Sequence, residues 1–473
     1  MPSSSHPDLA ERFLRQRQAF NDDINPSYAL RLQRLDRIQQ MIDQHGDAIA
    51  AAISADFGNR PTQVTQIADL LTVNASLRHT RKNLKRWMRP RRAPTAWQYR
   101  PGYNRLQRQP LGVVGIISPW NYPCELALSP AIAALAAGNR VMLKPSELTP
   151  RFSTLLETIV SQHFHTDELT VITGDADVGR SFAELPFDHL FFTGSTAVGR
   201  LVAQAAARNL TPVTLELGGK SPAIIDVSCD MRVAAPRIAF GKLLNSGQTC
   251  IAPDYMLVPQ ARINEFVSAM QTAVTRMYPG IEDNPDYTSI ISERHYLRLQ
   301  QLLDDARQQG ATVIDLGPAS EQVRAARRKL APTLVLNTSS SMRLMQEEIF
   351  GPILPVLGYH TLEQALALIR QHERPLALYW FGRDRANRSS VLRNTIAGGV
   401  TINDCLLHIA QKDQPFGGVG ASGMGAYHGE SGFRTFSKET AVFFQARING
   451  VALLYPPYGA AFRRMAALLR KIG

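Results

Sequence analysis

Cysteine is scarce in this chain. The 473 residues include four cysteines, and no two of them form a Cys-X-X-Cys pair. This scarcity argues against a disulfide framework and against a cysteine-based zinc site, so we expect no bound metal. Free thiols suit a reducing compartment, where a nucleophilic thiol survives, and we therefore expect a cytoplasmic protein.

Long apolar stretches are also missing. Residues 1–8 are polar and no apolar segment follows them, which does not match a secretory signal. The sequence contains no uncharged apolar run of about 18 residues, so no membrane span is expected. Residues 459–473 predict a short basic amphipathic helix, and a segment of this kind does not by itself make a stable membrane anchor.

Acidic residues are outnumbered by basic ones. The chain has 40 Asp and Glu against 52 Lys and Arg, a formal net charge of +12. Such an excess can attract nucleic acid or anionic membrane, but part of it is concentrated in residues 81–92 and 463–471. We interpret both segments as solvated surface and expect no nucleic-acid partner, although a positive field would also suit a dinucleotide or an acidic substrate.

The order of patterns along the chain predicts an α/β protein. Residues 7–56 and 61–88 have the apolar spacing of amphipathic helices. Residues 89–104 are rich in Pro, Arg and aromatics and predict a linker or an extended arm. From residue 111 onward, short β-branched runs alternate with helical segments, which is typical of a parallel sheet. The predicted strands are residues 112–117, 140–144, 169–172, 189–192, 223–225, 255–258, 312–314, 334–336 and 353–356. Residues 437–449 alternate apolar and polar side chains and suggest a strand added to a partner's sheet.

Two residues in the middle of the chain suggest covalent chemistry. Glu216 ends an apolar strand-like run, in Leu-Glu-Leu-Gly-Gly-Lys, and Cys250 follows a helix-like stretch, in Gly-Gln-Thr-Cys. A thiolate is a nucleophile and a carboxylate can act as the base for water. The alternatives are a small buried cysteine and a turn-forming glutamate.

A glycine-rich turn follows the strand predicted at 189–192. The motif Gly-Ser-Thr-Ala-Val-Gly contains Gly194, Ser195, Thr196 and Gly199 and opens a helix, whose free N–H groups favour a pyrophosphate. A plain tight turn is the alternative. Lys144, Ser146 and Glu147 come straight after another strand, where a lysine and a carboxylate could hold ribose hydroxyls.

The strand at 112–117 leads into Ser-Pro-Trp-Asn-Tyr-Pro, which contains Trp120, Asn121 and Tyr122. A side-chain amide such as that of Asn121 is a good donor to an oxyanion. An asparagine between aromatic residues is also a common turn residue.

These motifs resemble the aldehyde dehydrogenase superfamily. Residues 215–222 together with 247–250 are similar to its catalytic pair, and residues 415–429 and 455–458 resemble its class 3-like branch, which includes coniferyl aldehyde dehydrogenases. The resemblance implies a Rossmann-like NAD-binding domain, a second α/β catalytic domain and a small β oligomerisation flap, usually in a homodimer.

The resemblance also implies a division of the chain and a role for each residue. The domains are residues 1–218 for the cofactor, with an arm at about 89–106 that joins the flap, 219–415 for catalysis, and 416–473 for oligomerisation. In the implied site Cys250 is the nucleophile, Asn121 and the Cys250 N–H are oxyanion donors, and Glu216 is the base. Cofactor contacts are implied for the glycine-rich turn, for the Lys-Pro-Ser-Glu segment and for Trp120, Glu348 and Phe350. Tyr122 and Phe416 are assigned to the substrate pocket. For Phe350, packing in the core is the alternative.

The implied activity is oxidation of an aldehyde to its acid through a thioester on Cys250. We expect NAD to be preferred, because Glu147 repels a 2′-phosphate, with NADP usable because Lys144 is adjacent. Aromatic or hydrophobic aldehydes are the expected substrates. An acylating, coenzyme A-dependent enzyme is an alternative that Glu216 argues against, since such relatives generally lack this base. The other alternative is a catalytically silent relative, which the joint presence of Asn121, Glu216 and Cys250 argues against.

Overall fold

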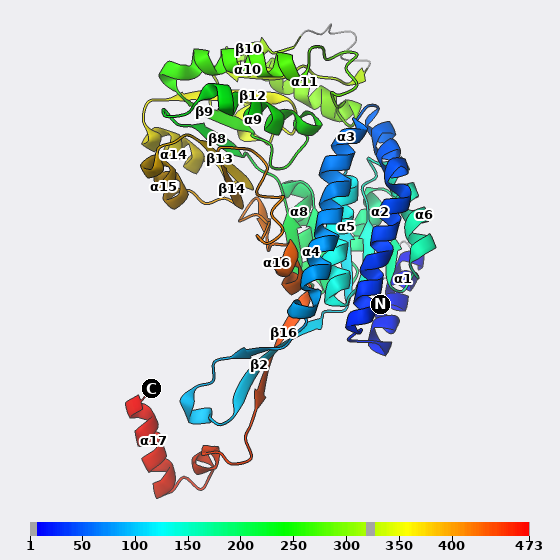
Figure 1. Ribbon diagram of the computed structural model, residues 1–473, viewed down its shortest axis with the longest axis vertical. Helices are drawn as coiled ribbons and strands as arrows, with labels where there is room; N and C mark the ends of the chain where they lie inside the picture. The colour runs from blue at the N-terminus through cyan, green and yellow to red at the C-terminus, as the bar shows by residue number, and fades with distance from the viewer. Residues whose placement is uncertain (1–6, 318–326, 473) are drawn as a thin grey trace.

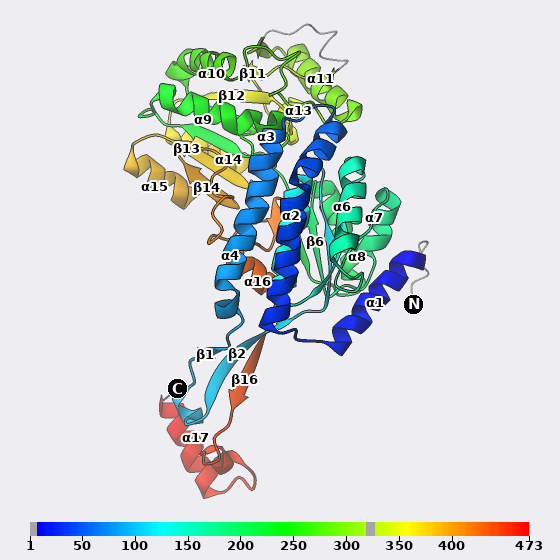
Figure 2. The same ribbon diagram turned by 45° about the vertical axis from the view of Figure 1, so that its right-hand side comes forward.

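The computed structural model describes residues 7–317 and 327–472. Two α/β bodies lie one above the other, and a narrow extension projects away from them and carries the C-terminal helix (Figure 1). The turned view in Figure 2 shows the same separation, with the long N-terminal helices running along the lower body toward the upper one. Two largely parallel sheets flanked by helices confirm the predicted α/β class.

The lower body contains a six-stranded sheet in the order β15-β7-β6-β3-β4-β5. Its strands are β3 (Val113–Ile117), β4 (Arg140–Lys144), β5 (Leu169–Val171), β6 (His189–Thr193), β7 (Val213–Glu216) and β15 (Gly423–Met424). All neighbouring pairs are parallel except β15 with β7. The central strands are buried, because helices cover both faces of a parallel sheet, and this explains their nearly continuous apolar sequences.

Helices surround this sheet. They are α1 (Pro7–Asp22), α2 (Tyr28–Phe57), α3 (Thr62–Thr65), the π-helical turn η1 (Gln66–Leu70), α4 (Leu71–Trp87), α5 (Pro123–Ala137), α6 (Pro150–His163), α7 (Ala176–Ala183), α8 (Thr196–Ala207) and α16 (Gly429–Thr435). The helix α5, which follows the predicted strand at 112–117, begins at Pro123. Every residue of α5 is buried, so no apolar stripe marks its first turn, and a proline at the first helical position is favourable.

The upper body contains a seven-stranded sheet in the order β10-β11-β12-β9-β8-β13-β14. Its strands are β8 (Pro222–Ile225), β9 (Tyr255–Pro259), β10 (Thr312–Asp315), β11 (Thr333–Leu336), β12 (Ile353–Tyr359), β13 (Ala377–Phe381) and β14 (Gly399–Ile402). Its helices are α9 (Met231–Leu243), η3 (Leu244–Gly247), η4 (Gln260–Arg262), α10 (Ile263–Met277), α11 (Glu293–Gln308), α13 (Arg343–Gln346), α14 (Leu362–Gln371) and α15 (Arg385–Asn394). The sequence did not identify β13 and β14. The run Ala377–Phe381 is short and fully buried, and periodicity cannot separate such a strand from a buried helical segment.

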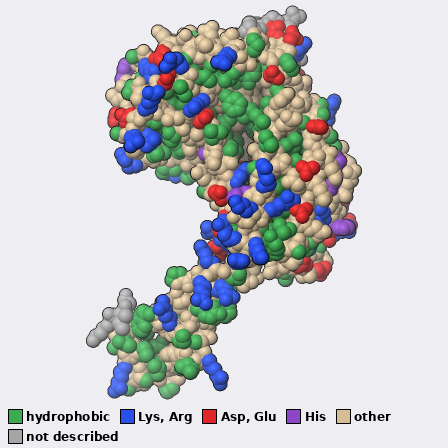
Figure 3. All heavy atoms as spheres, viewed as in Figure 1, with side chains coloured by type: hydrophobic (Ala, Val, Ile, Leu, Met, Phe, Trp, Pro, Cys, Tyr) green, Lys and Arg blue, Asp and Glu red, His purple; other side chains and the backbone are tan. Residues whose placement is uncertain are grey.

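The extension is a three-stranded antiparallel sheet built from two distant parts of the chain. Its order is β1 (Arg91–Ala93), β2 (Tyr103–Pro110) and β16 (Ser437–Phe444). One edge of β16 pairs with β2 of the same chain along its whole length, and β16 is the last strand of this sheet. That residues 437–449 also add a strand to a partner's sheet stays a prediction. The remaining elements here are η2 (Trp97–Tyr99), η5 (Val451–Leu454) and α17 (Ala460–Ile472). Lys and Arg side chains gather where the extension meets the lower body (Figure 3).

Neither a membrane-spanning helix nor a metal-binding cluster is found among the described residues. Within residues 7–317 and 327–472, no helix combines the length and apolar character that crossing a bilayer requires. Over the same ranges, no group of three or more His, Cys, Asp or Glu side chains is placed to hold a metal ion.

Candidate active site

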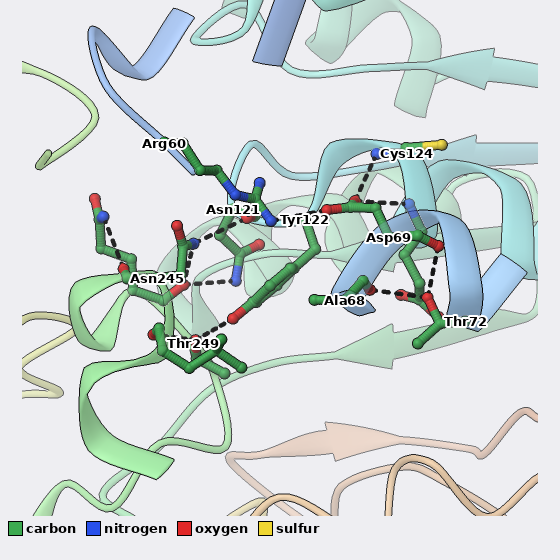
Figure 4. A network of polar contacts seen from close by, with 12 residues as sticks. Arg60, Ala68, Asp69, Thr72, Asn121, Tyr122, Cys124, Asn245 and Thr249 are labelled. Carbon is green, nitrogen blue, oxygen red and sulfur yellow. Dashed lines mark hydrogen bonds and ion pairs between the residues drawn. The ribbon is translucent and has the colours of Figure 1, made fainter. Parts of the chain in front are cut away.

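Three predicted residues meet where the two bodies face each other. Glu216 is the last residue of β7, Asn121 follows β3, and Cys250 follows η3 of the upper body. The Nδ2 of Asn121 donates to the carbonyl oxygen of Gln248, two residues before Cys250, at 3.2 Å. The amide of Asn121 is therefore fixed against the cysteine loop (Figure 4).

The loop before Cys250 has an unusual backbone. Asn245, Ser246 and Gly247 all have left-handed φ angles, of 53°, 53° and 75°. A Cβ on Gly247 would lie 2.3 Å from the carbonyl oxygen of Gly351, so only glycine fits there. Non-glycine residues in this conformation cost of order 1–3 kcal/mol each and persist only where the surroundings hold them.

Gln248 supplies much of that support. Its Nε2 donates to the carbonyl oxygens of Asn245 at 3.0 Å and Ser289 at 3.1 Å. Its Oε1 accepts from the N–H of Ile291 at 3.0 Å. This buried side chain closes the tight loop, which explains the Gln in the Gly-Gln-Thr-Cys motif.

Cys250 is half-buried, whereas Cys124, Cys229 and Cys405 are buried. Burial raises the pKa of the Cys250 thiol, and the carboxyls of Glu348 and Glu216 raise it further. The thiol is therefore the resting form, and a nearby positive charge or a base is needed to produce the nucleophilic thiolate.

Glu216 is enclosed and unpaired. Its side chain is 3% exposed, and neither carboxyl oxygen has a hydrogen-bond partner among the described residues. Burial raises the pKa of this carboxyl well above its usual value, and the neighbouring carboxyl of Glu125 adds to the effect. A buried acid without partners is poised to exchange a proton with any water that reaches it.

Glu125 belongs to a second layer of buried groups that the sequence did not single out. Burial raises the pKa of Glu125, while Lys412 and a hydrogen bond from Ser129 oppose the shift. Tyr427 and His428 lie in the same layer, and their polar side-chain atoms have no partner in the described part of the chain. Glu125 sits within the apolar-looking helix α5, so no local pattern distinguished it.

The predicted pyrophosphate turn forms the start of α8. The Oγ of Ser195 caps the helix by accepting from the N–H of Val198 at 3.4 Å, and the Oγ1 of Thr196 donates to the carbonyl oxygen of Ala421 at 3.1 Å. A Cβ on Gly194 would lie 2.5 Å from the ring of Phe192. At Gly199 a Cβ would lie 2.6 Å from the Cδ2 of Leu217. Glycine at both positions allows close backbone packing at this helix N-terminus.

Lys144 and its neighbours lie at the end of β4. The Nζ of Lys144 donates to the carbonyl oxygen of Pro145 at 2.9 Å, and burial lowers the pKa of this lysine. Ser146 is 9% exposed and its Oγ accepts from the N–H of Leu148 at 3.2 Å. Glu147 is exposed. The lysine keeps two further N–H donors, which suits ribose hydroxyls.

Glu348 and Phe350 approach from the upper body. Burial raises the pKa of Glu348 to about 8, and the N–H of Gly219 donates to its carboxyl. A Cβ on Gly218 would lie 2.1 Å from the Oε2 of Glu348, so this glycine makes room for the carboxyl. Phe350 has a φ of 53° and packs edge-to-face on Trp120, with 5.4 Å between the ring centroids.

This set of residues fits a nicotinamide dinucleotide. The start of α8, Lys144 and Glu348 border the same strand ends, where open α/β sheets bind ligands. The buried hydroxyls of Ser118, after β3, and Thr193, at the end of β6, lack a hydrogen-bond partner among the described residues. These donors and the helix N-terminus offer an anionic, hydroxyl-rich ligand the contacts that it needs.

The two residues predicted for the substrate pocket differ in position. The hydroxyl of Tyr122 lies 2.6 Å from the Oγ1 of Thr249, beside the cysteine. Phe416 is 5% exposed, and its ring stacks on His408 at 6.0 Å and His428 at 5.4 Å between centroids. Tyr122 therefore lies beside the reaction centre, whereas Phe416 is packed among aromatic rings.

Comparison with known proteins agrees with this geometry. A model of the aldehyde dehydrogenase family matches residues 6–442. A protein of Pseudomonas aeruginosa named probable coniferyl aldehyde dehydrogenase is 50% identical over 457 residues, which are 97% of this chain and 95% of that protein.

Solved structures give the same result. The substrate-bound AldH of Staphylococcus aureus superposes with a TM-score of 0.92 at 37% identity, covering 98% of this chain and 99% of that one. An aldehyde dehydrogenase of Mycobacterium tuberculosis complexed with NAD⁺ has a TM-score of 0.83 at 27% identity, covering 94% and 91%. The resemblance seen in the motifs is confirmed, and the chain belongs to the aldehyde dehydrogenase family and is an aldehyde-oxidising enzyme that uses a nicotinamide cofactor.

Proposed function

We propose that this enzyme oxidises aromatic or hydrophobic aldehydes similar to coniferyl aldehyde to their carboxylic acids. The observation that carries the chemistry is the meeting of Asn121, Cys250 and the unpartnered carboxyl of Glu216 at one point between the two bodies. The name of the Pseudomonas aeruginosa relative, which is similar over almost the whole chain, supports the substrate class.

In the first half of the reaction, the Cys250 sulfur attacks the aldehyde carbon and the carbonyl oxygen becomes an oxyanion. The Asn121 amide donates one N–H to the carbonyl oxygen of Gln248, and its second N–H can donate to the oxyanion. The N–H of Cys250 is the other donor. Two preorganised donors stabilise charge that develops only during the reaction.

In the second half, Glu216 takes a proton from water as the water attacks the thioester. The carbon–sulfur bond then breaks, the acid leaves, and the Cys250 sulfur is released. Burial raises the pKa of the Glu216 carboxyl, and a carboxylate of higher proton affinity takes a proton from water more readily.

A bound nicotinamide cofactor would supply the hydride acceptor needed for thioester formation, and its positive charge would favour the Cys250 thiolate. The sugar and phosphates of the cofactor would be held by Lys144, Ser146 and the start of α8. The nicotinamide end would be held by Glu348 and by Phe350, whose ring packs on Trp120. NAD is the preferred form in this proposal, since the exposed carboxylate of Glu147 disfavours a 2′-phosphate. NADP remains usable because Lys144 is adjacent.

The proposal also includes a cytoplasmic homodimer assembled through the extension. Several apolar side chains of this extension are exposed, and a second copy of the chain would cover them. They include Trp97, Tyr99, Phe443, Tyr455 and Tyr458. Sedimentation of the purified protein measures this, and a monomer at micromolar concentration would contradict it.

Assays on purified protein with a panel of aldehydes test the substrate class. We expect kcat/KM to be higher for cinnamaldehyde-type substrates than for succinic semialdehyde or betaine aldehyde, and higher with NAD than with NADP. Coenzyme A should leave the rate unchanged. A clear preference for the small polar aldehydes contradicts the substrate class, and higher efficiency with NADP contradicts the role of Glu147.

A further inference from the structure

Arg60 and Asp69 form an ion pair that is completely buried. The Nη2 of Arg60 lies 2.8 Å from the Oδ2 of Asp69, and neither side chain is exposed to solvent. Removing two charges from water is costly, and an isolated buried pair often adds no stability over apolar residues of similar size. The contacts around the pair therefore indicate what it does.

Both partners act on the segment that carries Asn121. The Nη1 of Arg60 donates to the carbonyl oxygen of Asn121 at 3.1 Å. The Oδ1 of Asp69 accepts from the N–H groups of Cys124 at 3.1 Å and Glu125 at 3.0 Å, in the first turn of α5. The pair thus holds the backbone on both sides of Tyr122 (Figure 4).

The surrounding structure leaves this pair little freedom. The guanidinium of Arg60 lies 5.3 Å from the ring centroid of Phe57 and 5.1 Å from that of Tyr122. Asp69 is part of the π-helical turn η1, and such turns are frequent at functional sites. The pair is therefore held in place by aromatic contacts on one side and by a helix start on the other.

The carbonyl of Asn121 receives a second donor from the other body. The Nδ2 of Asn245 donates to the same oxygen at 3.0 Å and to the carbonyl oxygen of Gln248 at 3.3 Å. The backbone of Asn121 is therefore held by Arg60 on one side, and by the cysteine loop on the other.

We propose that Arg60, held by Asp69, is a positioning residue that sets the distance between the Asn121 amide and the Cys250 loop. This inference rests on the oxyanion role proposed for Asn121. An oxyanion donor is effective only when it is fixed before the reaction, and a displacement of about 1 Å can cost about 10²-fold in rate.

The substitution Arg60→Lys tests the proposal. The ammonium can still pair with Asp69, but it lacks the planar fork that also reaches the Asn121 carbonyl. We expect the rate of thioester formation to fall about 10–100-fold, with little change in the Kd for NAD. Aldehyde deuterated at the carbonyl carbon should show a larger isotope effect than in the unaltered enzyme. An unchanged rate and isotope effect in folded protein overturn the proposal.

A double-mutant cycle with Asn121→Ala separates this inference from the proposed function. If Arg60 acts through the Asn121 amide, Arg60→Lys should change the rate less than about twofold once that amide is absent. Full additivity overturns the positioning role while leaving the role of Asn121 intact. Normal activity of Asn121→Ala alone overturns the oxyanion assignment and this inference with it.

A matched control lies on α2, the helix that ends just before Arg60. Arg34 in α2 forms a buried ion pair with Glu168 at 3.0 Å. Arg34→Lys should alter stability without changing the isotope effect, and an equal rate loss in this variant would show that any buried pair has the same influence. If Arg60→Lys does not fold, the neutral pair Arg60→Gln with Asp69→Asn is measured in its place. It should also slow thioester formation at least about 10-fold, and an unchanged rate overturns the proposal.

Discussion

The two sides of the reaction centre differ in how their polar atoms are satisfied. Around Asn121, its carbonyl oxygen, its amide nitrogen and the carboxylate of Asp69 are all paired. Among the described residues, the Nε of Arg60, the Oδ1 of Asn245 and the hydroxyl of Ser118 lack partners there. Around Glu216, several buried polar atoms lack partners among the described residues. These are both carboxyl oxygens of Glu216, the hydroxyl of Tyr427, both ring nitrogens of His428 and the Nε2 of His408.

The proposed mechanism gives a reason for this difference. Stabilising an oxyanion requires donors that do not move, and a densely paired hydrogen-bond network holds them. Activating water requires groups that accept and release protons, and such groups cannot be saturated by fixed partners. In the proposed mechanism, the Asn121 side therefore serves placement and the Glu216 side serves proton exchange.

The largest expected loss of activity comes from replacing Cys250, which lies between the two sides of the site. Cys250→Ala should lower turnover by at least about 10⁴-fold, because both halves of the reaction use this sulfur. Cofactor affinity should persist. Steady-state assays and NAD titration of the variant measure this, and normal activity would exclude Cys250 as the nucleophile.

A change confined to the proton-exchange side should separate the two halves of the reaction. Glu216→Gln should produce a fast burst of about one reduced cofactor per active site, followed by a steady rate lower by about 10²–10⁴-fold. Mass spectrometry should find the acyl group on the Cys250 peptide. If instead the burst is absent and the melting temperature falls, Glu216 serves the structure of the turn and not the chemistry.

A substitution on the Asn121 side of the site should slow thioester formation, the first half of the reaction. Gly247→Ala forces a Cβ to within 2.3 Å of the Gly351 carbonyl oxygen at a left-handed φ. We expect a loss of about 1–3 kcal/mol in the free energy of unfolding and a smaller burst rate. Stopped-flow kinetics and thermal denaturation measure both, and an unaltered burst would mean that the loop tolerates displacement.

The smallest effect concerns the pH dependence of the second half. Glu216 works as a base only when deprotonated, so the deacylation rate should rise as pH increases through its pKa. The nearby carboxyl of Glu125 raises that pKa. Glu125→Gln should therefore lower it and move the rising limb to lower pH, with a rate change of a few-fold at neutral pH. A limb that stays in place or moves to higher pH would contradict this coupling.

Local sequence patterns were enough to predict the fold class and the family. Alternating strands and helices predicted the α/β class, and the glycine-flanked motifs around Glu216, Cys250 and Gly194 identified the family, because each chemical group is encoded together with the backbone shape that presents it. The structure explains one residue of the cysteine motif, because the side chain of Gln248 closes the loop before Cys250.

Only the folded structure shows which buried residues hold the site in place. Asp69 lies in the π-helical turn η1 and Arg60 in the short connection between α2 and α3, and charged residues in such segments usually face solvent. Glu125 lies in a helix without an apolar stripe. The strand β16 pairs with β2, where Ser437 lies opposite Pro110. The hydrogen bonds around Asn121 come from Arg60 and reach Gln248, which lie 61 and 127 residues away in the sequence. Burial and pairing are properties of neighbours in space, and no local pattern records them.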